Sequence, residues 1–367
     1  MKFRFLIFVI LVLSACKNNP EPAEETDNAQ SFFLGTYTDG ESEGIYLYDL
    51  KADGILALNK LMAKSENPSF LAMDKNRTHL LAVNELDSGT IESFKIYPDS
   101  LAFVSRSATG GAHPCFVSIS ADGYVLAANY TGGNVGLLKL KDDDKLSELL
   151  FVQQHTGSSI KEQQKSPHAH AAWFVPESNE IIAVDLGTDE LWLSQLENNQ
   201  LTPSSPDRLP METGAGPRHL TIHPNSKWFY VVNELNSTVT LVERDETGKY
   251  KALISVSTLP EGYSESSYCA DIHISSDGQF VYASNRGHNS IGVFSVNNEN
   301  GLLTPIGHES THGDWPRNFA LSPEEDFLLV ANQRSNNIAS FKRDKTTGLL
   351  EFVSEIKAPS PACILFK

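Results

Sequence analysis

The sequence has little positive charge, few cysteines and no apolar stretch long enough to form a permanent membrane helix. Its 29 lysines and arginines face 46 aspartates and glutamates, for a formal net charge of −17. Nucleic acids attract basic surfaces, so this balance argues against nucleic-acid binding. With 40 % hydrophobic and 20 % charged residues, the chain nevertheless has the composition of a globular protein with a substantial core.

The cysteines exclude two further classes of protein. The sequence contains no Cys-x-x-Cys pair, and besides Cys16 it has only Cys115, Cys269 and Cys363. An odd number in an exported chain argues against a disulfide framework. All three lie beside apolar, strand-like runs, so we expect small buried hydrophobic side chains rather than nucleophiles.

The first residues differ in composition from the rest. Lys2 and Arg4 precede an apolar run over residues 5–13, which is short for a bilayer span but suits a secretory signal. Residues 13–16, Leu-Ser-Ala-Cys, resemble a bacterial lipobox. We therefore predict a lipoprotein signal peptide over 1–15, lipidation of Cys16 and a solvated tether over 16–30. The alternative is a plain signal peptide in which Cys16 has no role.

One unit recurs along the chain: an apolar run, a polar turn and a second apolar run that usually ends in Asn or Asp. This is the pattern of a β-hairpin. The second runs end 45 to 56 residues apart. Their last residues are Thr36, Asn84, Asn129, Asp185, Asn233, Asn285 and Asn332.

A further turn signal downstream of each hairpin implies four strands per unit. Units of about fifty residues cannot cover both of their faces alone, and stacking them radially gives a β-propeller. Seven copies fill residues 31–367, which predicts an all-β, seven-bladed propeller with four antiparallel strands per blade. Residues 361–366 resemble an innermost strand without its blade, so we expect this C-terminal strand to join the N-terminal blade and close the ring. Two separate β-sandwiches would not explain the regular spacing.

Strand direction brings two sets of residues to one end of the ring, here called the mouth. Each innermost strand begins there and its antiparallel neighbour returns there. Counting back 15 residues from each anchor selects Ser69, Pro114, His170, Arg218, Ala270 and Arg317. Counting forward one selects Glu85, Tyr130, Leu186, Glu234, Arg286 and Gln333. Polar groups that converge on a concave mouth predict a functional site.

Motifs along the chain carry a family resemblance. They are Gly-Thr-Tyr-Thr at 35–38, Asn-Pro-Ser at 67–69, Ala-Asn-Tyr-Thr-Gly-Gly at 128–133, Pro-His-Ala-His at 167–170, Asp-Leu-Gly at 185–187, Gly-Pro-Arg-His at 216–219, Asn-Glu-Leu at 233–235, Ser-Asn-Arg-Gly at 284–287 and Asn-Gln at 332–333. Together they resemble the lactonase family of seven-bladed propellers, which includes the propeller-type 6-phosphogluconolactonases and is similar to the fungal carboxy-muconate lactonising enzymes. The resemblance implies that His170, Arg218, Glu234 and Arg286 match the family's proposed catalytic positions. We expect the neighbouring His168, Glu85, Tyr130 and Arg317 to contact substrate.

The chemistry of these residues suits lactone hydrolysis. The reaction needs a base that activates water and positive groups that stabilise an oxyanion. His170 or Glu234 could be the base, and the sequence does not rank them. Arg218 and Arg286 could bind a carboxylate or phosphate; alternatively, they pair with Glu234 and Glu85 only to tie blades together.

Other histidines receive a plainer interpretation. His113, His219, His223 and His273 are expected to be strand or loop histidines. A metal pair of His168 and His170 is conceivable at strand spacing, but no third ligand recurs nearby, so we expect no metal and no cofactor.

The sequence therefore predicts a monomeric hydrolase of a sugar lactone. It would be lipid-anchored in the bacterial cell envelope, periplasmic or associated with the outer membrane, and would contact the membrane only through its anchor. This address conflicts with 6-phosphogluconolactone, a cytoplasmic intermediate, so we expect an aldonolactone as substrate, with the phosphorylated lactone accepted in vitro. The alternatives are a propeller that only binds an anionic ligand or a protein partner, and a cycloisomerase-like lactonising enzyme.

Overall fold

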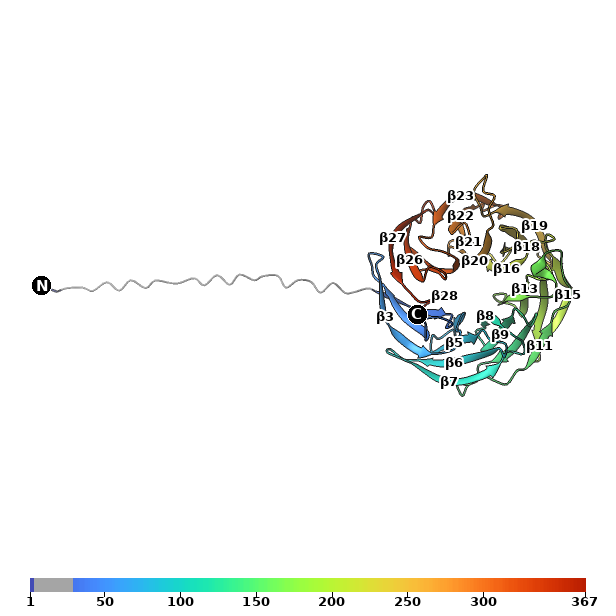
Figure 1. The fold of residues 1–367 in the computed structure, drawn as a ribbon, viewed down its shortest axis with the longest axis horizontal. Coiled ribbons are helices and arrows are strands. Elements are labelled where there is room, and N and C mark those ends of the chain that lie inside the picture. The colour runs from blue at the N-terminus through green and yellow to red at the C-terminus, as the bar shows by residue number, and fades with distance from the viewer. Residues whose placement is uncertain (3–28) are drawn as a thin grey trace.

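The computed structural model describes residues 29–367 and the first two residues. The predicted signal peptide, Cys16 and most of the predicted tether lie outside the described residues. Within the described part of the chain, no helix has the length and apolar character needed to cross a bilayer. The chain forms seven four-stranded antiparallel sheets arranged around a central axis (Figure 1). This arrangement confirms the predicted all-β, seven-bladed propeller.

We number the blades in chain order, beginning with the blade that contains the N-terminal strand. The innermost strands of blades 1 to 7 are β28 (Pro361–Phe366), β4 (Leu71–Met73), β8 (Pro114–Ile119), β12 (Ala169–Phe174), β16 (Pro217–Ile222), β20 (Tyr268–Ile274) and β24 (Pro316–Leu321). The second strands are β1 (Gln30–Thr36), β5 (His79–Asn84), β9 (Tyr124–Asn129), β13 (Glu180–Asp185), β17 (Trp228–Asn233), β21 (Phe280–Arg286) and β25 (Phe327–Asn332).

The remaining strands lie further from the axis. The third strands are β2 (Gly44–Leu50), β6 (Thr90–Ile96), β10 (Asn134–Lys139), β14 (Glu190–Glu197), β18 (Thr238–Arg244), β22 (Ser290–Val296) and β26 (Asn337–Arg343). The outer strands are β3 (Leu56–Lys64), β7 (Leu101–Ala108), β11 (Phe151–Gln154), β15 (Gln200–Pro210), β19 (Tyr250–Ser257), β23 (Leu303–Ser310) and β27 (Leu350–Lys357). A short 3-10 helix, η1 (Glu162–Gln164), lies in the connection to blade 4.

The ring closes as the sequence predicted. The C-terminal strand β28 pairs antiparallel with β1, with Leu34 opposite Ile364 and Phe32 opposite Phe366. Blade 1 therefore contains both ends of the propeller, which leaves no unpaired innermost edge at the seam.

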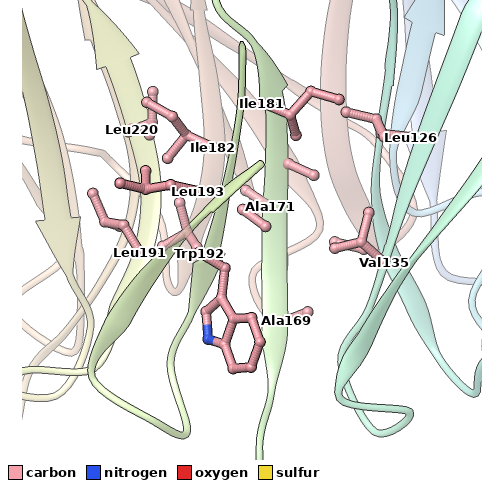
Figure 2. Packing of buried hydrophobic residues seen from close by; sticks show 14 of the residues in the cluster. Leu126, Val135, Ala169, Ala171, Ile181, Ile182, Leu191, Trp192, Leu193 and Leu220 are labelled. Carbon is pink, nitrogen blue, oxygen red and sulfur yellow. The ribbon is translucent and has the colours of Figure 1, made fainter. Parts of the chain in front are cut away.

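The core lies between neighbouring blades. Side chains along a strand alternate between faces, so Ile181 of β13 points toward Leu126 of blade 3 while Ile182 points toward Leu220 of blade 5 (Figure 2). Both faces are buried, which explains why the second strands read as continuous apolar runs rather than as an alternating pattern.

The repeated Asn or Asp at the end of the second strand is a structural cap. The amide of Asn332, for example, donates to the carbonyl of Thr311 at 2.9 Å, and that of Asn285 donates to the carbonyl of Thr258 at 2.9 Å. Both amides are fully buried. The anchors therefore end strands, and the residues beside them are left for the mouth.

Candidate active site

A bulge at the start of four innermost strands aims side chains at the axis. The pairing register shifts at Cys115 of β8, His170 of β12, Arg218 of β16 and Arg317 of β24. A bulged residue is not paired with the neighbouring strand, and its side chain is re-aimed. The expected position Pro114 is wrong by one residue: Pro114 pairs with Asn129, because its hairpin is one residue shorter, and Cys115 takes the bulge instead.

Arg218, Glu234 and Arg286 form one cluster between blades 5 and 6. Arg218 Nε lies 3.0 Å from Glu234 Oε2, and Arg286 Nη2 lies 2.8 Å from the same oxygen. Gly216, with a φ of +64°, turns the chain so that its carbonyl accepts the backbone N–H of Glu234 at 2.6 Å. This turn holds Glu234 beside the strand that carries Arg218.

The two guanidinium groups also bind backbone carbonyls of blade 6. Arg286 donates to the carbonyls of Cys269 at 2.9 Å and of Tyr268 at 3.3 Å, and Arg218 donates to that of Ala270 at 2.5 Å. Both arginines therefore bridge the blades while they face the mouth. Of the expected pairings that would tie blades together, the one with Glu234 is present.

Electrostatics keep this cluster charged. Burial raises the pKa of Glu234, but Arg286 and Arg218 outweigh it and hold that pKa below its ordinary value. Burial, followed by the charge of Arg286, lowers the pKa of Arg218 to about 10. At neutral pH the cluster thus contains one carboxylate between two cations.

A second cluster joins blades 1, 2 and 7. The hydroxyl of Tyr37 donates to Glu85 Oε2 at 2.7 Å, and Ser69 Oγ donates to the same oxygen. Arg317 Nη2 lies 3.9 Å from it, and the Arg317 guanidinium lies 5.1 Å from the centre of the Tyr37 ring. Glu85 therefore pairs with Arg317 rather than with Arg218 or Arg286.

Blades 3 and 4 supply an aromatic and imidazole wall. The ring of His168 stacks on that of Tyr130 with centroids 4.4 Å apart, and its Nδ1 lies 2.9 Å from the Tyr130 carbonyl. His170 meets the edge of Tyr130 at 5.5 Å, and its Nδ1 lies 3.6 Å from Cys115 Sγ. The two histidines thus serve different contacts.

His170 is the neutral group of the mouth. Burial, followed by the charge of Arg218, lowers its pKa well below 6.5. Its Nε2 forms no hydrogen bond with the residues that the structure describes and is not among their fully enclosed unpaired atoms. This nitrogen can therefore accept a proton at neutral pH.

Several neighbours escaped the sequence analysis. Tyr37 follows the anchor Thr36, so the rule of one residue after the anchor finds it once it is applied to the first unit. Leu186, selected by that rule, is fully buried. Cys115, Cys269 and Cys363 are free and buried, as expected. Among the described residues, no three or more His, Cys, Asp or Glu side chains are grouped to hold a metal ion.

Comparison with known proteins agrees with this architecture. A family model described as "Lactonase, 7-bladed beta-propeller" matches residues 31–366. The chain is similar to a 6-phosphogluconolactonase of Bacillus subtilis, with 39 % identity over 91 % of this chain and 97 % of that protein.

Two solved structures show the same likeness. A periplasmic gluconolactonase of Pseudomonas aeruginosa matches with a TM-score of 0.89 and 30 % identity over 92 % of this chain and 99 % of that one. A protein from Lactobacillus plantarum matches with a TM-score of 0.88 and 33 % identity over the same shares of the two chains. The chain therefore belongs to the lactonase family of seven-bladed β-propellers.

Proposed function

We propose that this protein hydrolyses the ester bond of an aldonolactone at the mouth of the propeller. The observation that carries the proposal is the meeting of a neutral His170, a carboxylate held by two arginines and a third arginine, Arg317, around one axis. Relatives named 6-phosphogluconolactonase and gluconolactonase support a sugar lactone as the substrate.

His170 is the base in this proposal. Its Nε2 takes a proton from water, the resulting hydroxide adds to the lactone carbonyl carbon, and the ring C–O bond breaks as the proton passes to the leaving alkoxide. Glu234 is the weaker candidate, because both arginines contact one of its oxygens and lower its pKa. Arg218 and Arg286 face the developing oxyanion, and Glu234 keeps their guanidinium planes in place.

Arg317 is the arginine best suited to bind an anionic group of the substrate. It forms no hydrogen bond with the described residues, and its nearest carboxylate is 3.9 Å away. Its donors are therefore available to a carboxylate or phosphate. Tyr130 and His168 offer ring surface to the sugar, and Glu85 can accept from a sugar hydroxyl.

The test is lactone disappearance with purified residues 17–367, on 6-phosphogluconolactone and on glucono-δ-lactone. We expect a rate above spontaneous hydrolysis on both, and its loss in His170→Ala. Binding of either lactone without turnover would leave the ligand-binding alternative. Formation of a lactone from an unsaturated acid would favour the lactonising alternative instead.

We also propose that Cys16 carries a lipid anchor and that the propeller works in the periplasm or at the outer membrane. The lipobox-like residues 13–16 support the anchor, and the periplasmic relative supports the compartment. The test is incorporation of labelled palmitate into the full chain, with Cys16→Ala as control. A soluble, unlabelled product from the unaltered chain would contradict the anchor.

A further inference from the structure

Asp271 lies beneath the mouth and is held by donors from three blades. Its Oδ1 lies 2.8 Å from Nδ1 of His219, and its Oδ2 accepts from the Asn318 amide at 2.6 Å and lies 3.2 Å from Nε2 of His273. The backbone N–H of Ile272 and of Phe319 also donate to this carboxylate. Burial raises its pKa, but His273 and the hydrogen bonds from His219 outweigh burial and hold the pKa far below its ordinary value. Asp271 is therefore ionised.

The partners of His219 fix its tautomer. An ionised carboxylate only accepts, so Nδ1 of His219 carries the hydrogen that faces Asp271. Its Nε2 lies 3.4 Å from Nη1 of Arg218, and a guanidinium only donates. Burial lowers the pKa of His219 to about 4, so the ring is neutral and its lone pair faces Arg218.

Arg218 is thereby oriented from three sides. His219 faces Nη1 from below, the Ala270 carbonyl accepts from the same nitrogen, and Glu234 faces Nε. We infer that Asp271 and His219 are positioning residues, which hold the Arg218 guanidinium, and through it Glu234, in the geometry that receives the lactone. This inference rests on the proposed function, because it assigns the two residues to the same reaction.

A purely structural role for the network is the competing explanation. Asn318 Oδ1 accepts the backbone N–H of Ile364 at 2.7 Å, so the same carboxylate also connects blades 5 and 6 to the closing strand β28, and all these elements adjoin the axis (Figure 1). His273 supplies the matched control: it contacts the other oxygen of Asp271, packs against Phe319 and has no contact with Arg218 in the described structure.

The experiment compares four variants of the full chain with the unaltered protein. Asp271→Asn allows an amide to donate to His219, which favours the opposite tautomer and turns an N–H toward Arg218. We expect it to lower kcat/KM about 100-fold, as small displacements of catalytic groups do. His219→Leu should match it. His219→Gln, whose amide can donate to Asp271 and accept from Arg218, should restore most of the activity lost in His219→Leu. His273→Gln should lower Tm but keep the kinetics.

Nitrogen NMR provides a readout that blade clamping would not move. We expect the Nδ1–H form of His219 in the unaltered protein and the Nε2–H form in Asp271→Asn. Kinetics of Asp271→Asn and His219→Leu that match those of His273→Gln would overturn the inference. If the unaltered protein hydrolyses neither lactone, the proposed function fails, and the Arg218 Nε–H signal then decides the positioning role: an unchanged signal in Asp271→Asn would refute it.

Discussion

Two blades carry the same pair of residue types at the same positions, and the structure uses them differently. Blade 5 has Arg218 at the bulge, near Glu234, and blades 7 and 2 supply Arg317 and Glu85 at the matching positions. Arg218 is 2 % exposed and contacts Glu234, Ala270 and His219, whereas the Arg317 side chain is 17 % exposed and lies 3.9 Å from its carboxylate. A closed ion cluster fixes geometry for chemistry, while an open one leaves donors for a ligand.

The strongest way to break this comparison is to remove the carboxylate from each cluster. Glu234→Gln leaves two buried guanidinium groups without a counter-charge, so we expect a loss of about 3 kcal/mol in unfolding free energy, together with loss of turnover. Glu85→Gln keeps an oxygen for Tyr37 and Ser69, and should cost less than about 1 kcal/mol. Urea denaturation measures both. Equal losses would show that the two clusters are equivalent.

Removing the proposed base should affect rate without affecting the clusters. We expect His170→Ala to lower kcat about 10²- to 10⁴-fold on both lactones, because it removes the group that activates water. KM should change little, since no anchoring contact is lost. The lactone assay checks kcat, and Tm is the control. A kcat near that of the unaltered protein would return the role of base to Glu234.

The fold was predictable because it repeats. Seven apolar runs at regular spacing, each ended by a capping residue such as Asn332, report the blades directly, and the apolar character of residues 361–366 revealed the closing strand. Both features arise from strands buried on two faces, which is a local property of the sequence.

The contacts of the site were less predictable. Which carboxylate Arg286 binds depends on how blades 5 and 6 meet, and the exchange of Cys115 for Pro114 depends on one residue of hairpin length. Asp271 was not found at all, because its partners His219 and Asn318 come from neighbouring blades and share no spacing with it. Positions at the mouth follow from the repeat, whereas partners follow from the packing between repeats.

Acid should weaken the closed cluster through His219. Its pKa of about 4 in the folded protein lies below the value of 6.5 for an unperturbed histidine, so the unfolded chain binds more protons between these values. The stabilising contribution of neutral His219 is therefore lost as pH falls from 6.5 to 4, by about 3 kcal/mol. His170 changes stability in the same direction, while the raised pKa of His273 opposes it.

The variant His219→Gln isolates this effect, because His170, His273, Asp271 and Arg218 remain in both proteins. Urea denaturation at about pH 7 and about pH 4.5 should show a smaller loss of stability in His219→Gln than in the unaltered protein. Parallel losses would mean that His219 does not titrate as its surroundings imply.

The smallest effect sharpens the open side of the comparison. Arg317→Ala should raise KM for 6-phosphogluconolactone about tenfold or more, because a charged hydrogen bond to the substrate is worth about 1.5–3 kcal/mol. KM for glucono-δ-lactone should change less, since that substrate lacks the anionic group. Unfolding free energy should fall by less than about 1 kcal/mol, because Arg317 makes only a distant ion pair. The control is Arg334→Ala, which removes an exposed arginine stacked on Trp315 and outside both clusters. Equal increases in KM for both lactones would place the anionic group elsewhere, and Arg286→Ala would then be the next variant to measure.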